Sequence, residues 1–280
     1  MDAVWEYARA VLIGVLLVIL FLRLFEDRLI YFPDQDAASD PHAQGLEVED
    51  VFLRAADGVE LHGWYAAAPG ARSTALFLHG NAGNLSHRID HIFFLRSLPV
   101  DVFALDYRGY GRSQGRPSEA GVYRDAEAAY DYLRRTRGVP AERLVVVGQS
   151  LGTAVAVELA ARRPVAGLIL EAAFPSARRV AQRVMWLPGV QWLVRTRFDS
   201  AATLRRLRLP VLVAHCTADP VIPYELGEEL FQAANEPKSF VRFEANCHEP
   251  LYLADPKAYA DRLRVFLSRV EAGRARAGGD

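Results

Sequence analysis

The stretch that decides the fold is Leu144-Val-Val-Val-Gly-Gln-Ser-Leu-Gly-Thr-Ala154, an apolar run followed by a serine between glycines. The apolar run predicts a buried strand, and residues 151–162 have the periodicity of a helix. The G-x-S-x-G spacing predicts a sharp turn between the two, because Gly148 and Gly152 let strand and helix approach closely. Ser150 then lies at the start of the helix, where free backbone N–H groups favour an anionic oxygen. We therefore expect Ser150 to be a nucleophile.

Outward from this stretch, short apolar runs alternate with helical segments. The apolar runs are residues 75–78, 102–105, 144–147, 168–170 and 211–214, with a weaker sixth at 240–243. Helical periodicity covers residues 87–97, 119–136, 151–162, 224–234 and 256–270. Residues 48–65 alternate instead around a turn, which predicts an antiparallel hairpin. The pattern predicts an α/β domain with a mostly parallel central sheet flanked by helices.

The 280 residues divide into one large domain and short appendages. We expect an N-terminal helix over residues 1–30, a linker over 31–45, the α/β domain over 46–272 and a disordered tail over 273–280. Within the domain, the interval at about 175–208 is too long for a simple crossover. It contains Trp186 and Trp192, and we expect a short cap over the carboxyl edge of the sheet, where ligands of such sheets bind.

The N-terminal segment is the most apolar part of the chain. Residues 10–22 are uninterrupted apolar side chains, and Trp5 and Tyr7 extend the run as an interfacial anchor. We expect a single-pass membrane anchor. A cleaved signal peptide would need a small-residue cleavage site, which residues 23–33 do not offer. A buried helix of the domain would be striped, whereas this segment is apolar all round. The charge asymmetry is too small to predict which side of the membrane the domain faces.

Composition narrows the function classes. The formal net charge is −1 without a long basic run, so nucleic acid is not an expected partner. The chain has only two cysteines, which excludes a thiolate zinc cluster. His87 and His91 are four residues apart on a helix, but no further ligand pattern accompanies them, and we interpret them as a solvated helix face. The sequence predicts no metal and no cofactor, and it leaves the oligomeric state open.

A serine hydroxyl needs a base and an orienting acid, and two later loops supply candidates. Asp219 follows the apolar run at 211–214, and His248 follows the run at 240–243. Because loops at the carboxyl ends of adjacent parallel strands meet, we expect Ser150, Asp219 and His248 to form a catalytic triad. Two alternatives stay open: Asp219 caps the next helix, or Glu171 supplies the acid.

The glycine-rich loop after the first parallel strand is the expected oxyanion site. The backbone N–H groups of Asn81 and Leu151 are our candidates for its two donors. His79 in the same loop is expected to bond backbone rather than to act in catalysis. Asp106 and Arg108, after the next strand, are expected to form a buried pair that braces the loops.

Several motifs together resemble the bud-emergence-type, ABHD-like group of membrane-anchored α/β-hydrolases. They are His79-Gly-Asn-Ala-Gly-Asn-Leu-Ser86, Asp106-Tyr-Arg-Gly-Tyr-Gly-Arg-Ser113, Gly148-Gln-Ser-Leu-Gly152 and the segment from His215 to Asp219. The resemblance runs from about residue 28 to the C-terminal helix. It implies the α/β-hydrolase fold, a short cap, and an esterase or acyl-thioesterase activity; the group includes protein depalmitoylases.

Two cysteines depart from the pattern of that group. Cys216 stands where a glycine is usual, and Cys247 precedes the expected catalytic histidine where a small residue is common. Each ends the strand before one of the two catalytic loops, so the pair could lie side by side. The hypotheses are a disulfide, which would indicate an oxidising compartment such as a periplasm, and two small buried thiols.

The leading functional hypothesis is a serine hydrolase that cleaves carboxylic esters or thioesters through an acyl-enzyme. The apolar anchor and the aromatic cap favour an acyl substrate derived from lipid, with the membrane itself as a partner. An amidase or peptidase would use the same triad. A membrane-anchored binding protein that kept the fold without the chemistry is the alternative from another class. The sequence does not define the acyl group.

Overall fold

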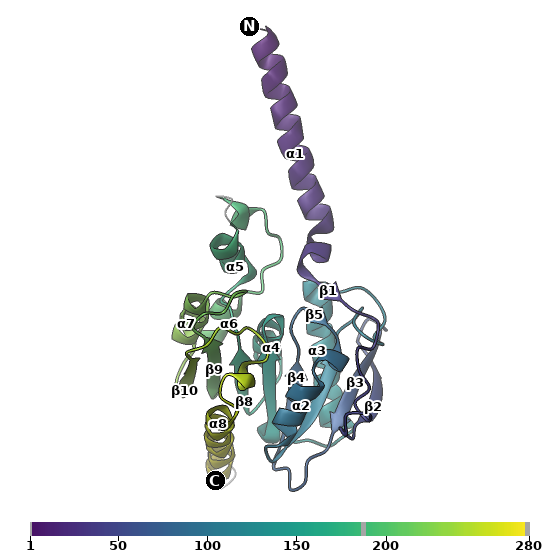
Figure 1. Cartoon of the computed structure of the whole chain (residues 1–280), viewed down its shortest axis with the longest axis vertical. Coiled ribbons are helices and arrows are strands. Elements are labelled where there is room, and N and C mark those ends of the chain that lie inside the picture. The colour runs from purple at the N-terminus through teal and green to yellow at the C-terminus, as the bar shows by residue number, and fades with distance from the viewer. Residues whose placement is uncertain (1, 186–188, 278–280) are drawn as a thin grey trace.

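A computed structural model describes residues 2–185 and 189–277. These residues form one α/β domain from which a long N-terminal helix projects (Figure 1). The strands are β1 (Phe32–Pro33), β2 (Glu49–Arg54), β3 (Glu60–Ala66), β4 (Ser73–Leu78), β5 (Ala82–Gly83), β6 (Val100–Asp106), β7 (Leu144–Gln149), β8 (Gly167–Glu171), β9 (Val211–Cys216) and β10 (Lys238–Phe243). The α-helices are α1 (Asp2–Ile30), α2 (Ile89–Arg96), α3 (Glu119–Arg135), α4 (Leu151–Arg162), α5 (Ala177–Val184), α6 (Ser200–Leu204), α7 (Tyr224–Ala233) and α8 (Pro256–Ala277).

The central sheet has eight strands in the order β10-β9-β8-β7-β4-β6-β3-β2. All neighbours from β10 to β6 pair in parallel, whereas β2 and β3 pair antiparallel at one edge. Helices cover both faces of the sheet (Figure 1). This arrangement confirms the predicted fold class, including the hairpin before the parallel strands.

The strand β7 illustrates why the apolar runs fold as they do. Every residue of β7 is buried. Leu144 and Val146 pack into the apolar cluster on one face of the sheet, while Val145 and Val147 pack into the cluster on the other face. A strand covered on both faces has no polar side, so its sequence is continuously apolar instead of alternating.

The segment expected to be a linker contains a short strand. Phe32 pairs with Ala82 and Pro33 with Gly83, so β1 and β5 form a separate two-stranded parallel sheet. A two-residue strand has no readable periodicity, and for this reason the sequence did not indicate it. The pairing attaches the chain just after α1 to the loop that follows β4.

At the C-terminus, the expectation of a disordered tail from residue 273 onward is wrong for residues 273–277. Helix α8 continues through Ala277. Alanine and arginine alternate over residues 274–277, and both are strong helix formers, which outweigh the single Gly273. Residues 278–280 of the expected tail lie outside the described residues.

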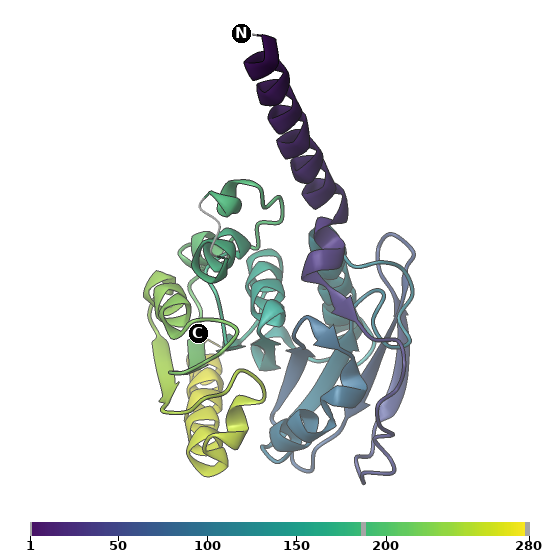
Figure 2. The same cartoon turned by 45° about the horizontal axis from the view of Figure 1, so that its top comes forward.

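The interval expected to be a cap lies beyond the carboxyl edge of the sheet, on the same side as α1 (Figure 2). It contains α5, a short 3-10 helix η3 (Val190–Trp192) and α6. Trp192 is 70% exposed on this cap. Trp186, the other aromatic residue named for it, lies outside the described residues.

Candidate active site

Ser150 lies on the sharp turn between β7 and α4. Its backbone has φ 50° and ψ −117°, a left-handed conformation that costs a non-glycine residue strain. A Cβ on Gly152 would overlap the carbonyl oxygen of Leu78, and a Cβ on Gly148 would overlap Gly152. The turn is held from the neighbouring strand, since the Ser150 N–H donates to the Glu171 carbonyl oxygen at 2.8 Å. The two glycines therefore allow the turn that presents Ser150.

The structure brings Ser150, His248 and Asp219 together in one hydrogen-bonded chain. His248 Nε2 lies 3.0 Å from Ser150 Oγ, and His248 Nδ1 lies 2.8 Å from Asp219 Oδ2. An ionised carboxylate only accepts hydrogen bonds, so Nδ1 carries the proton. Nε2 of the neutral ring is then free to accept from the serine hydroxyl. This is the geometry that a general base beside a nucleophile requires.

Asp219 is held in its ionised form by surrounding donors. Burial opposes its ionisation, but hydrogen bonds from His215 and His248 outweigh burial and hold the pKa of Asp219 well below its usual range. The backbone N–H groups of Val221 and Ile222 also donate to its Oδ1, at 2.8 and 2.9 Å. These bonds fix the carboxylate that faces the imidazole.

His215 belongs to this site although the sequence indicated only a strand residue. It is fully buried, and its Nε2 lies 2.9 Å from the Ile222 carbonyl oxygen and 3.3 Å from Asp219 Oδ2. Both neighbours are acceptors, so Nε2 carries a proton that supports the acid. The only available signal was a polar residue in an otherwise apolar strand, four positions before the acid.

Glu171, the alternative acid, is directed elsewhere. Its carboxyl Oε1 accepts from the Tyr259 hydroxyl at 2.6 Å, and its Oε2 lies 3.5 Å from His91 Nε2. The side chain is fully buried, and burial raises the pKa of Glu171 to about 8. A carboxyl group that stays protonated at neutral pH is a poor stabiliser of an imidazolium ion.

The two cysteines are paired in a disulfide between Cys216 and Cys247, with a Cα–Cα separation of 5.7 Å. This separation is within the ordinary range for disulfides. The bond joins the last residue of β9 to the residue before His248. The loop that carries the acid and the loop that carries the base are therefore covalently linked.

The expected oxyanion loop follows β4 and adjoins the start of α4. Leu151 is the first residue of α4, and Gly152 packs directly against the carbonyls of Leu78 and His79. The stretch from Gly80 to Asn81 thus continues from a point next to the nucleophile turn. His79 Nδ1 lies 2.6 Å from the Gly80 carbonyl oxygen, the backbone contact expected for this residue.

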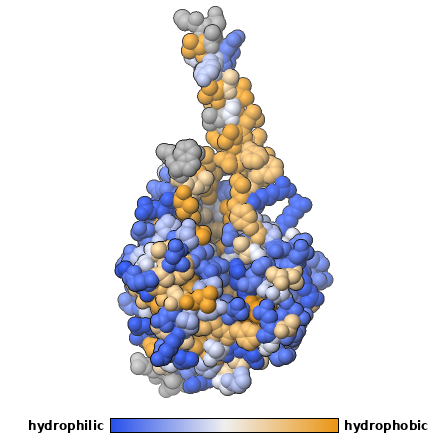
Figure 3. Space-filling view, in the orientation of Figure 1, coloured by the Kyte–Doolittle hydropathy of each residue, from blue (hydrophilic) through white to orange (hydrophobic). Residues whose placement is uncertain are grey.

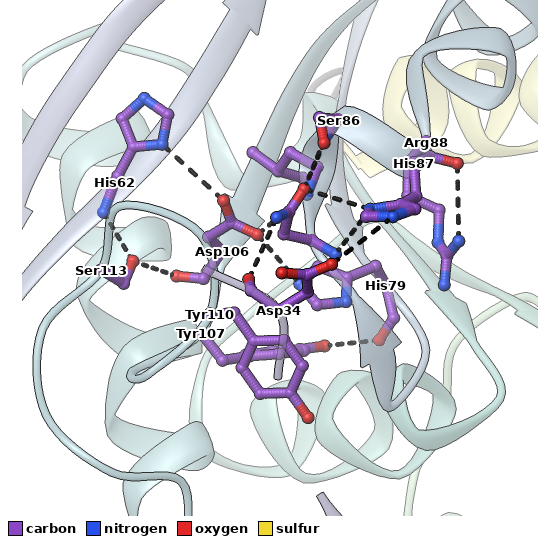
Figure 4. A network of polar contacts seen from close by, with 12 residues as sticks. Asp34, His62, His79, Ser86, His87, Arg88, Asp106, Tyr107, Tyr110 and Ser113 are labelled. Carbon is purple, nitrogen blue, oxygen red and sulfur yellow. Dashed lines mark hydrogen bonds and ion pairs between the residues drawn. The ribbon is translucent and has the colours of Figure 1, made fainter. Parts of the chain in front are cut away.

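The expected pairing of Asp106 with Arg108 is wrong. Arg108 binds Asp125 and Asp57 instead, with nitrogen–oxygen distances of 2.8 Å to both. Arg108 lies two residues beyond the end of β6, where strand alternation no longer sets the direction of a side chain, and Asp106 faces His62 and His79, as Figure 4 shows for the network around it. The two residues brace the loops through separate partners.

A second ion pair in the site was not indicated by the sequence. Arg88 Nη2 lies 3.1 Å from Glu249 Oε2, and Arg88 also donates to the Ala82 carbonyl oxygen at 2.9 Å. Glu249 Oε1 lies 3.8 Å from His248 Nε2. The pair therefore connects the loop after β4 with the loop that carries His248, and Arg88 balances the charge of a carboxylate beside the His248 ring.

The interpretation of His87 and His91 as a solvated face is wrong for His91. His91 is buried and stacks on Phe77 with ring centroids 4.8 Å apart. Burial, and then the charge of Arg88, lower the pKa of His91 to about 3.

Among the residues that the structure describes, no group of three or more His, Cys, Asp or Glu side chains could hold a metal ion.

A mostly parallel sheet, with a serine on the turn after β7 and a histidine and an acid on later loops, defines the class of α/β hydrolases. The family model for the alpha/beta hydrolase fold matches residues 76–209. The protein Rv2307c of Mycobacterium tuberculosis is 37% identical over 90% of this chain and 91% of its own length. The alpha/beta hydrolase domain-containing protein WAV2 of Arabidopsis thaliana is 32% identical over 88% of each chain. The chain belongs to the alpha/beta hydrolase family.

The solved structures agree on the fold. The Pyrococcus furiosus esterase Pf2001 superposes with a TM-score of 0.71 at 21% sequence identity, covering 85% of this chain and 98% of that one. An alpha-beta hydrolase from Vibrio vulnificus superposes with a TM-score of 0.68 at 24% identity, covering 80% and 82%. At these identities the similarity extends to the architecture alone.

Proposed function

We propose that the protein is a serine hydrolase that cleaves carboxylic esters or thioesters through an acyl-enzyme. The observation that carries the proposal is the hydrogen-bonded chain from Ser150 Oγ through His248 to Asp219, at 3.0 and 2.8 Å. The same three residue types at these separations serve acyl transfer on several unrelated folds. These three residues lie at the carboxyl edge of the sheet beneath the cap, which is where this fold binds ligands.

In the proposed reaction, His248 Nε2 takes the hydroxyl proton as Ser150 Oγ attacks the carbonyl carbon. The backbone N–H groups of Asn81 and Leu151 stabilise the oxyanion, and the start of α4 adds its dipole. His248 then gives the proton to the leaving alkoxide or thiolate. Water, activated by the same imidazole, hydrolyses the acyl-enzyme, and Asp219 stabilises the imidazolium ion in both steps.

The protein is proposed to act at a membrane with α1 as a single-pass anchor. Residues 4–30 of α1 are long and apolar enough to cross a bilayer. Figure 3 shows this helix as a mainly apolar column above a largely hydrophilic domain surface. The cap lies on the same side of the domain as the helix (Figure 2), and its residues Val184, Met185 and Trp192 are exposed. These features favour an acyl substrate that is drawn from lipid.

The disulfide supports a catalytic domain on the oxidising side of that membrane. Disulfides persist in compartments such as a periplasm and are rare where thiols are kept reduced. Cys216 is fully buried, so the bond is shielded from solvent at one end.

The experiment that tests the proposed function is a matched substrate series with the purified full-length protein in detergent. The p-nitrophenyl esters from acetate to palmitate, an acyl-CoA thioester and a p-nitroanilide are compared, with Ser150→Ala as the control. We expect ester and thioester hydrolysis that is lost in the control. A preference for the anilide would indicate an amidase, and equal rates for wild type and Ser150→Ala would contradict the proposal.

A further inference from the structure

The chain that leaves α1 is bonded directly to the expected oxyanion loop. The Phe32 N–H donates to the Asn81 carbonyl oxygen at 3.0 Å, and the Asp34 N–H donates to the Gly83 carbonyl oxygen at 3.2 Å. These two hydrogen bonds belong to the pairing of β1 with β5. The only chain segment between α1 and the loop contact is Tyr31, which is itself buried. A single buried residue therefore separates the end of the helix from the loop contact.

Asn81 also reaches back to the helix with its side chain. Its Nδ2 donates to the carbonyl oxygen of Ile30, the last residue of α1, at 2.7 Å. The last carbonyls of a helix have no partner within the helix, so this bond satisfies one of them. The Asn81 carbonyl oxygen accepts from the Tyr110 hydroxyl at 2.8 Å as well. Three bonds, two to its carbonyl oxygen and one from its side chain, thus hold the residue whose N–H is the proposed oxyanion donor.

A second set of hydrogen bonds holds the chain at Asp34, shortly after β1. The carbonyl oxygen of Asp34 accepts from Asn84 Nδ2 at 3.0 Å and from the Gly111 N–H at 2.8 Å. Asp34 lies beside the Asp106 network in Figure 4. The segment after α1 is therefore bonded both to the loop after β4 and to the loop after β6.

On its other side the helix binds the cap. The Glu26 carboxylate accepts from the backbone N–H of Thr196 at 2.6 Å and from that of Arg195 at 3.0 Å. Glu26 is 7% exposed. A buried carboxylate is costly unless it is bonded, so losing this side chain would leave two cap N–H groups without their acceptor.

We propose that the last turns of α1 are a positioning element of the active site, with Asn81 and Glu26 as its positioning residues. Asn81 fastens the oxyanion loop to the end of the helix, and Glu26 fastens the cap to the same turns. The helix thereby sets the distance between the oxyanion donor and the acyl-binding cap. The proposal rests on the proposed ester hydrolysis, and its test includes a readout that is independent of catalysis.

The loop contact is tested with Asn81→Ala, which keeps the backbone N–H and removes only the side-chain bond to Ile30. We expect kcat on p-nitrophenyl acetate to fall about ten- to hundred-fold with KM nearly unchanged, because a small misplacement of an oxyanion donor has effects of this order. Asn81→Ser, which keeps a donor, is expected to lie in between. It also serves as the test variant if Asn81→Ala does not fold.

The matched control is Asn235→Ala. Asn235 Nδ2 also donates to backbone carbonyls, those of Arg205 and Leu207, each at 2.8 Å, but it lies on the loop after α7. This change removes the same kind of bond away from the triad. We expect a lower unfolding temperature with kcat and KM unchanged. A fall in kcat equal to that of Asn81→Ala would overturn the proposal, because the effect would then be one of general stability.

The cap contact is tested with Glu26→Ala against Asp27→Ala, the neighbouring acid, which only approaches the Arg195 side chain at 3.4 Å. We expect Glu26→Ala to raise KM about ten-fold for p-nitrophenyl octanoate, with little change for acetate, because the cap holds the acyl chain. Asp27→Ala should change neither. Equal effects of the two variants on both esters would contradict the role of Glu26.

Hydrogen–deuterium exchange separates this proposal from the proposed function. In Asn81→Ala the amides of residues 79–84 should exchange faster, in Glu26→Ala those of residues 194–198, and in Asn235→Ala neither set. If wild type hydrolyses none of the esters but exchange changes as expected, the proposed function fails and the structural coupling stands. If exchange in both loops is unchanged in both variants, the coupling is wrong whatever the activity.

Discussion

Two acids with buried side chains lie at or just after the ends of the neighbouring strands β8 and β9. Their surroundings shift their pKa values in opposite directions. Asp219 follows β9 and Glu171 ends β8, and each has at least one histidine beside it. Asp219 receives hydrogen bonds from His248, His215 and two backbone N–H groups, and its pKa is lowered. Glu171 receives one bond, from Tyr259, and full burial raises its pKa to about 8. Burial opposes the ionisation of both acids, and only Asp219 has enough donors to outweigh it.

The charged acid is the one that suits the proposed triad. In the proposed reaction a charged carboxylate stabilises the imidazolium ion on His248, whereas a protonated one does not. Glu171 instead contributes its backbone carbonyl, which accepts from the Ser150 N–H. The end of β8 thus supports the turn that carries Ser150, and the loop after β9 supplies the charged carboxylate of Asp219.

The largest expected effect is that of exchanging the two acids for their amides. Asp219→Asn should lower kcat about 10³- to 10⁴-fold on p-nitrophenyl esters, because the imidazole loses its orienting charge and its correct tautomer. Glu171→Gln keeps the backbone carbonyl and should change kcat by less than about five-fold. Steady-state kinetics of both variants provide the test. Equal losses would show that the two acids do not differ in the way described.

The disulfide next to the charged acid should matter for stability. The double variant Cys216→Ser with Cys247→Ser should lower the unfolding free energy by about 3 kcal/mol, since the bond closes a loop between residues 31 positions apart. Urea unfolding in detergent measures the change. Mass spectrometry after alkylation without reductant is the check on the bond itself: two alkylated thiols in freshly isolated protein would show that it does not form.

The two acids should also respond to pH in opposite windows. Glu171 has a raised pKa, so its contribution to stability is full below about pH 4.5 and is lost as the pH rises toward about 8. Asp219 has a lowered pKa, so its contribution is present at neutral pH and is lost only in acid. Wild type should lose about 3 kcal/mol of unfolding free energy through Glu171 between pH 5 and pH 8. The unfolding free energy of Glu171→Gln should not fall in this way. If the unfolding free energies of the two proteins change in parallel with pH, the assigned role of Glu171 is wrong.

The smallest effect concerns the two histidines that flank the acids. His215→Phe removes a donor to Asp219 and should lower kcat/KM about ten-fold, the effect of one hydrogen bond to a charged group. His91→Phe is the matched change beside Glu171. It replaces the buried His91 ring, which stacks on Phe77, and should leave kcat/KM unchanged. Both variants are compared by kinetics and by unfolding temperature. A loss of activity confined to His91→Phe would reverse the assignment.

The sequence is most informative where one local pattern determines one local structure. The run from Leu144 to Ala154 predicted strand, turn and helix, because burial on both faces and two glycines leave few alternatives. Chain order placed Asp219 and His248 on later loops, and the structure has them within hydrogen-bonding distance of each other and of Ser150.

What the sequence did not indicate depends on contacts between distant segments. The two-residue strand β1 has no periodicity, and its partner β5 lies 50 residues away in register. His215 and Arg88 acquire their roles only through what packs against them, at Asp219 and Glu249. Arg108 pairs with Asp57 and Asp125 and not with Asp106, because it lies beyond the end of β6, where spacing in sequence no longer reports side-chain direction.

The most direct test of the central claim is labelling with a fluorophosphonate probe, followed by peptide mass spectrometry. Such probes react with a serine hydroxyl only when a base activates it and donors hold the resulting anion. We expect one equivalent of probe on the peptide that contains Ser150, strongly slowed labelling in Asp219→Asn, and none in Ser150→Ala. Folded wild type that takes up no probe, or that takes it up equally in Ser150→Ala, would contradict the assignment of Ser150, His248 and Asp219 as a catalytic triad.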